Sequence, residues 1–324
     1  MAARLNPAPY RPSEVVDLRR LTAPELDPLL EEEVAEWRGE LEWDFRKSAE
    51  LVRRFVDLRA LNGAAWVEEG GVAGYAYYVL EENKGLIGDL YVRRALRTVE
   101  RENALLDWAL EAIMASPAVG RIESQIMMLR TERRRPLPQA AYATAYERNF
   151  MRVELPHADL RVGRVRRLSY VENWSDHYHD GAAQVIAAAY AGHIDSRIND
   201  QYRTASGARR FLHNIVQYPG CGTFSRAASF AAFDAVSGRL CGLSLASLVA
   251  PECGHITQIC VAPPVRGTGI GHELLRQSLT ALRNIGCRSA SLTVTAANED
   301  AVKLYERVGF RTIRRFSALV WEGF

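Results

Sequence analysis

The stretch ICVAPPVRGTGIGHELLRQSL, residues 259–279, decides the fold of this chain. A β-branched apolar run ends at two prolines, and an arginine and a glycine-rich segment follow. Leucines then recur at helical spacing, at Leu274, Leu275, Leu279 and Leu282. Proline ends strands and glycine favours tight turns. The stretch therefore predicts a strand, a bare turn at Gly267, Gly269 and Gly271, and a helix.

The glycine turn predicts a phosphate ligand. The first turn of a helix carries unsatisfied N–H groups and the positive end of the helix dipole, and bare backbone lets an anion approach. Arg266 adds a fixed positive charge. A dinucleotide fingerprint would need a third glycine where His272 stands, and a P-loop would need a lysine that is absent. A nucleotide-binding or dehydrogenase domain therefore lacks its diagnostic pattern.

The same order of elements occurs twice in the chain. An ungapped offset of 169 places Val92 on Val261 and Arg97 on Arg266. Similar stretches on both sides keep this order, which predicts an internal duplication into two domains, 1–163 and 164–324. Within the first copy, we expect a strand over 86–92, a helix that carries the apolar residues from Leu105 to Ile113, a strand over 121–129 and a helix over 138–150.

The first copy lacks the bare turn. Under the same offset the three glycines become Thr98, Glu100 and Glu102, so two carboxylates stand where a pyrophosphate would bind. Tyr146 aligns with Tyr305. We expect the first domain not to bind such a phosphate ligand, and to be structural or to shape a pocket at the interface between the two copies.

The second copy resembles the GNAT superfamily of N-acetyltransferases. Arg266 to Gly271 matches the family's R/Q-x-x-G-x-G/A loop, and Val261-Ala262-Pro263 precedes it as V-x-P. The family's Asn-x-x-Ala-x-x-x-Tyr-x-x-x-Gly-Phe helix matches Asn298, Ala301, Tyr305, Gly309 and Phe310. The resemblance implies an α/β (α+β) protein with two tandem GNAT-like domains, each a mixed, mostly antiparallel sheet flanked by helices.

The resemblance also implies a site for acetyl-CoA as co-substrate. In the family, the loop amides bind the pyrophosphate, here at Arg266, Gly267, Thr268, Gly269, Ile270 and Gly271. The preceding strand pairs with the pantetheine arm through its backbone, here at Ile259, Cys260 and Val261. The asparagine that Asn298 matches commonly contacts the cofactor in the family, although a role as the N-cap of the helix explains Asn298 equally well.

The resemblance gives Tyr305 the role of general acid that protonates the CoA thiolate. A packing role for a helical tyrosine is the alternative. The base is not evident: the strand before the loop carries no acid, Glu252 and His255 are the nearest candidates, and His193 and Asp195 are candidates for the acceptor site. Ordered water is a further candidate. The family precedent of direct attack leaves Cys260 as a packing residue.

Composition restricts the partners. The net charge is +2 over 324 residues, which gives no case for nucleic acid, and the basic run at 130–135 is typical of a solvated loop. No apolar stretch is long enough to span a membrane, and residues 1–14 have no signal-peptide core. Five cysteines without a CxxC spacing favour a cytoplasmic protein with no metal site.

Two functions remain open at this stage. The first is an acetyl-CoA-dependent N-acetyltransferase that acts on a primary amine of a small molecule or peptide by direct attack in a ternary complex. The second is a non-catalytic protein that binds or senses acyl-CoA. We expect a monomer or a homodimer.

Overall fold

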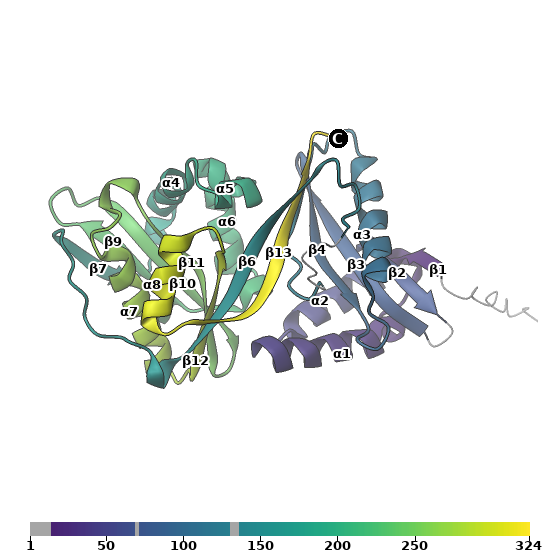
Figure 1. The fold of residues 1–324 in the computed structure, drawn as a ribbon, viewed down its shortest axis with the longest axis horizontal. Coiled ribbons are helices and arrows are strands. Elements are labelled where there is room, and N and C mark those ends of the chain that lie inside the picture. The colour runs from purple at the N-terminus through teal and green to yellow at the C-terminus, as the bar shows by residue number, and fades with distance from the viewer. Residues whose placement is uncertain (1–13, 69–70, 130–135) are drawn as a thin grey trace, which may run out of the picture. The chain divides into compact units, whose positions relative to one another are not determined.

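The computed structural model describes residues 14–68, 71–129 and 136–324, so the basic run at 130–135 and most of the N-terminal segment lie outside it. The chain forms two compact units that interleave along the sequence (Figure 1). The first unit holds residues 1–36, 46–145 and 317–324, and the second holds 37–45 and 146–316. This differs from the single boundary at 163/164 expected from the sequence, because short segments from each half belong to the other unit.

The first unit is an antiparallel sheet with one parallel pair. Its strands follow the order β1-β2-β3-β4-β5, and the end of β13 pairs antiparallel with β5 from Leu319–Ser124 to Glu322–Arg121. Helix α3 packs on β2, β3 and β4. The elements are β1 (Glu14–Asp17), α1 (Ala23–Leu41), α2 (Arg46–Asp57), β2 (Asn62–Glu68), β3 (Gly71–Glu81), β4 (Lys84–Val92), α3 (Val99–Met114) and β5 (Arg121–Ser124).

The second unit has a six-stranded path, β6-β12-β11-β10-β9-β7, with the two-residue strand β8 beside β10. Helices α7 and α8 share a core with one face of the sheet, and α4 and α6 pack on the other. The elements are β6 (Ala143–Glu154), β7 (Ser169–Asn173), α4 (His179–Tyr190), α5 (Asp195–Ile198), α6 (Ala205–Gln217), β8 (Thr223–Phe224), β9 (Phe230–Asp234), β10 (Leu240–Ala250), β11 (Cys253–Val261), α7 (Ile270–Asn284), β12 (Ser289–Thr295), α8 (Glu299–Val308) and β13 (Arg311–Glu322).

The helix expected over 138–150 is wrong. Residues 143–154 form strand β6, which pairs antiparallel with the whole of β12, from Arg148–Thr295 to Glu154–Ser289. Alanine, glutamate and arginine favour helices locally, but the hydrogen-bond ladder offered by β12 overrides that preference. Tyr146 therefore lies on a strand, and its alignment with the helical Tyr305 does not hold. The strand expected over 121–129 is also shorter, because β5 ends at Ser124.

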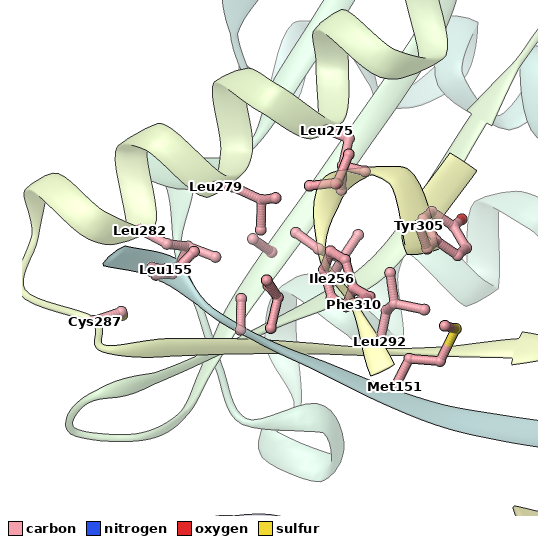
Figure 2. Packing of buried hydrophobic residues seen from close by; sticks show 14 of the residues in the cluster. Met151, Leu155, Ile256, Leu275, Leu279, Leu282, Cys287, Leu292, Tyr305 and Phe310 are labelled. Atoms are coloured by element: carbon pink, nitrogen blue, oxygen red, sulfur yellow. The ribbon is translucent and has the colours of Figure 1, made fainter. Parts of the chain in front are cut away.

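The core beneath α7 and α8 fixes the site. Leucines along α7 pack on Ile256 of β11, Leu292 of β12 and Met151 of β6 (Figure 2). Asn298 caps α8, its side chain accepting from Ala301 N, and Gly309 ends the helix with a positive φ of 108°. These caps agree with the sequence pattern. Among the helices in the described ranges, none is long and apolar enough to cross a membrane.

Candidate active site

Strands β11 and β12 separate in the C-terminal half of β11, next to the glycine loop. They pair in parallel only from Cys253–Ser289 to Ile256–Leu292. The register of β11 on β10 shifts at Thr257, which is the extra residue of a β-bulge, and pairing with β10 then continues to Val261. The β12-facing backbone edge of Ile259, Cys260 and Val261 is therefore unpaired within the described part of the sheet. An extended ligand arm can add to such an edge as a strand.

The glycine loop follows this edge directly. Gly267 and Gly269 have φ of 72° and 95°, a region that side chains rarely adopt. A methyl group on Gly267 would meet no atom within 4 Å, and one on Gly271 would meet only Val261 Cγ1 at 3.8 Å. The backbone is thus uncovered at Gly267 and meets only one side chain at Gly271, which fits a pyrophosphate held by amides.

The N-terminus of α7 offers those amides. Gly269 is the N-cap and supplies no side-chain acceptor, and Glu273 N donates to the Gly269 carbonyl oxygen at 3.0 Å. The N–H groups before Glu273 precede the helical ladder and can face an anion. Thr268 Oγ1 donates to the Val265 carbonyl at 2.7 Å, which fixes the turn. The Arg266 guanidinium donates to the Ala189 carbonyl near the end of α4.

Tyr305 lies on α8 at the edge of the core in Figure 2, with its hydroxyl directed away from the aliphatic side chains. The hydroxyl has no hydrogen-bond partner among the described residues. Burial, followed by the nearby charge of Asp195, raises the pKa of Tyr305, so the phenol stays protonated near neutral pH. A protonated, unpartnered hydroxyl is suited to deliver a proton to a ligand atom.

A polar network brings Asp195 to the same region. Thr295 Oγ1 donates to Asp195 Oδ1, and Arg148 Nη1 lies 3.5 Å from that oxygen. Arg148 also donates to Thr295 Oγ1 at 3.1 Å. Asp195 Oδ2 lies 3.7 Å from His193 Nδ1, too far for a hydrogen bond, and has no other partner in the described ranges. One oxygen of a largely buried carboxylate is therefore free.

A second hydrogen-bond network ties the end of α4 and the segment that follows α5 to β11. Gln258 donates to the Tyr190 hydroxyl at 3.0 Å and accepts from the Tyr202 hydroxyl at 3.2 Å. The two tyrosine rings stack with their centroids 4.3 Å apart. With Asp195 bonded to Thr295, the segment 190–203 is anchored to both separated strands. Sequence reasoning missed Arg148, Thr295, Gln258, Tyr190 and Tyr202, because only the fold brings these distant positions together.

The other candidates for a base are placed differently. Glu252 is exposed at the start of β11 and pairs with Arg288 at 3.1 Å, at the opposite end of the strand from the loop. His255 is buried between Trp43 and Phe150, with Nδ1 2.9 Å from Ser291 Oγ. Burial lowers the pKa of His255 to about 3, so it is neutral. His193 Nδ1 accepts from the amide of Asp195 at 3.2 Å, which leaves its proton on Nε2.

Cys260 stays a thiol. Burial raises its pKa to about 12, so little thiolate forms near neutral pH. A neutral thiol is a weak nucleophile, which argues against an acetyl-cysteine intermediate.

The comparisons agree with this geometry. Residues 186–310 match the family model described as the acetyltransferase (GNAT) family. The matched residues lie within the second unit, and the acyl donor of this family is acetyl-CoA.

Sequence relatives cover parts of the chain. A mycothiol acetyltransferase from Mycobacterium sp. (strain JLS) is 35% identical over 94 residues, 27% of this chain and 30% of that protein. The N-alpha-acetyltransferase MAK3 of Arabidopsis thaliana is 36% identical over 62 residues, 19% of this chain and 33% of that protein. The chain thus spans about a third of the length of these curated relatives.

Solved structures match over nearly the full length. The GCN5-related N-acetyltransferase from Sphaerobacter thermophilus has a TM-score of 0.66 at 21% identity, covering 96% of this chain and 95% of that one. A tandem GNAT protein from the clavulanic acid biosynthesis pathway has a TM-score of 0.62 at 17% identity, covering 96% and 98%. This likeness shows the fold, and it confirms the tandem GNAT arrangement expected from the duplication.

Proposed function

We propose that the second unit transfers the acetyl group of acetyl-CoA to a primary amine of a small molecule or peptide, by direct attack in a ternary complex. The observation that carries this proposal is the coincidence of three features: the glycine loop, the unpaired edge of β11 and the free hydroxyl of Tyr305. One relative is named for N-alpha-acetylation and another for mycothiol, which supports an acetyl transfer but leaves the acceptor open.

The donor would bind along β11 and the loop. The amides from Gly267 to Gly271 would hold the pyrophosphate, and the backbone of Ile259, Cys260 and Val261 would pair with the pantetheine arm. A backbone N–H at this edge would donate to the thioester oxygen as it gains negative charge, a contribution of about 3 kcal/mol per donor. Asn298 would contact the donor only in addition to its capping role.

Asp195 is the best-placed group for the acceptor amine. Its free oxygen, Oδ2, can accept an N–H from the attacking nitrogen, and its other oxygen is held by Thr295 and Arg148. When the nitrogen bonds to the thioester carbon, its proton passes to Asp195, directly or through one water. The carbon–sulfur bond then breaks, and Tyr305 gives its proton to the CoA sulfur. Proton transfer from Asp195 to Tyr305 restores both groups, so the step needs no other reactant.

The test is thiol release from acetyl-CoA across a panel of primary amines: amino-acid amides, short peptides, glucosamine and spermidine. The proposal expects thiol release that depends on one class of amine, with a matching acetylated product by mass spectrometry. Tight binding of acetyl-CoA without turnover on any amine would contradict it and would favour the acyl-CoA-binding alternative.

A further inference from the structure

The segment that leads into β7 lies directly on the glycine loop. The amide of Arg166 donates to the Thr268 carbonyl oxygen at 2.8 Å. A methyl group on Gly269 would lie 2.6 Å from the Arg164 carbonyl oxygen, so this glycine also makes room for the segment. Val165, between the two arginines, packs against the cluster that contains Val265 and Ile270. The backbone of 164–166 is therefore fixed against the loop.

This segment carries four arginines, and they divide into two pairs. Arg161 lies 2.6 Å from Asp159, and Arg167 lies 2.5 Å from Asp234. Arg164 and Arg166 are exposed, and their guanidinium groups have no ion-pair partner among the described residues. Their Cα atoms are held by the backbone contacts above, so only side-chain freedom is lost when they bind a ligand. The loop is thus bordered by two exposed arginines whose backbone positions are fixed and whose guanidinium groups have no ion-pair partner in the described ranges.

The proposed donor has more negative charge than the loop can accept. CoA carries a pyrophosphate and, on its adenosine ribose, a separate 3′-phosphate. The α7 amides are few and suit the pyrophosphate, while the Arg266 guanidinium is already bonded to the Ala189 carbonyl. A phosphomonoester has a charge of about −2 at neutral pH and pairs well with planar guanidinium groups.

We propose that Arg164 and Arg166 bind the 3′-phosphate of CoA, so that this chain discriminates CoA from dephospho-CoA. The inference rests on the proposed donor site at the glycine loop. It assigns a ligand to the start of the second copy, residues 164–166, which the family motif does not include. Fixed backbone positions lower the ordering cost of such a contact.

The experiment measures the dissociation constants of CoA and dephospho-CoA by calorimetry at one ionic strength, for the full chain. The variants are Arg164→Gln/Arg166→Gln and, as a control in the same segment, Arg161→Gln, which removes an arginine paired with Asp159. The wild type should bind CoA at least about tenfold more tightly than dephospho-CoA. The double variant should lose this ratio through weaker CoA binding alone, and the control should keep it.

Two results overturn the inference and leave the donor site standing. The first is equal affinity of the wild type for the two ligands. The second is a double variant that binds both ligands more weakly by the same factor. That result would mean that the arginines contact the pyrophosphate, or attract both ligands through long-range electrostatics, and do not recognise the 3′-phosphate. Absence of binding of either ligand by the wild type would instead contradict the donor site and the inference together. Melting temperatures of all proteins exclude unfolding as the cause.

Discussion

The hydroxyl of Thr295 donates a hydrogen bond to Oδ1 of Asp195, and this contact joins the end of β12 to helix α5. It holds one carboxylate oxygen and leaves the other, Oδ2, without a partner in the described ranges. The bond forms where β12 has already parted from β11. This largely buried carboxylate is thus held in one orientation, with one oxygen able to accept a hydrogen bond from a ligand.

Asp195→Asn should lower kcat by about a hundredfold or more, because the amide cannot take the amine proton. The acetyl-CoA dissociation constant should change less than about twofold, since Asp195 is not assigned to the donor site. Asp180→Asn is a suitable control, because Asp180 is exposed on α4 and pairs with Arg209 on the surface. Steady-state kinetics with calorimetry separate the two effects. Equal kcat for the wild type and Asp195→Asn would exclude Asp195 as the proton acceptor.

Gly271→Glu should abolish CoA binding without loss of stability. A methyl group at this position would make only an ordinary van der Waals contact, with Val261 Cγ1 at 3.8 Å, and an acid in the first turn of a helix is favourable for folding. The carboxylate would repel the pyrophosphate at contact distance. Gly271→Ala, which adds only a methyl group, should bind CoA within a few-fold of the wild type. Calorimetry and thermal denaturation measure both properties, and tight CoA binding by the glutamate variant would place the pyrophosphate elsewhere.

The full chain should bind one CoA. In the first unit, the aligned Arg97 makes two hydrogen bonds to Glu36, at 2.6 and 2.8 Å, and one to the Val92 carbonyl. Thr98 caps α3 with its side chain, and Glu102 is buried. In the first unit, side chains of the protein itself therefore occupy the hydrogen-bonding groups that would face a phosphate at the counterpart of the glycine loop. Calorimetric titration gives the stoichiometry directly, and two equivalent sites would refute the asymmetry.

His255 should make stability depend on pH. Burial lowers its pKa to about 3, whereas an unfolded histidine titrates near 6.5. Between these values the unfolded state binds more protons, so the free energy of unfolding falls as pH falls, by up to about 1.4 kcal/mol per pH unit. His255→Gln should remove this part of the slope, whereas His213→Gln, at an exposed site on α6, should keep it. Urea denaturation at pH 7.5, 6 and 5 is the measurement. An unchanged slope in His255→Gln would contradict the assignment.

The sequence predicts the elements that are governed by local signals. The prolines after β11, the α7 leucines and the caps of α8 lie within a few residues of the boundaries they set. The interleaving of the units was not predictable in this way, because Leu319 pairs with Ser124 across nearly two hundred residues. Trp43 reaches His255 for the same non-local reason. The proposed donor site follows from one contiguous motif, whereas the proposed acceptor site is assembled from residues of β6, α5, β11 and β12.

The ratio of kcat for the wild type to that for Tyr305→Phe tests the central claim most directly, with the acetyl-CoA dissociation constant measured on both proteins. The phenylalanine keeps the ring in its core and removes only the unpartnered hydroxyl. The account predicts a kcat lower by about a hundredfold or more, with donor binding within about twofold. Equal kcat values would contradict the assignment of Tyr305 as the acid that protonates the CoA thiolate.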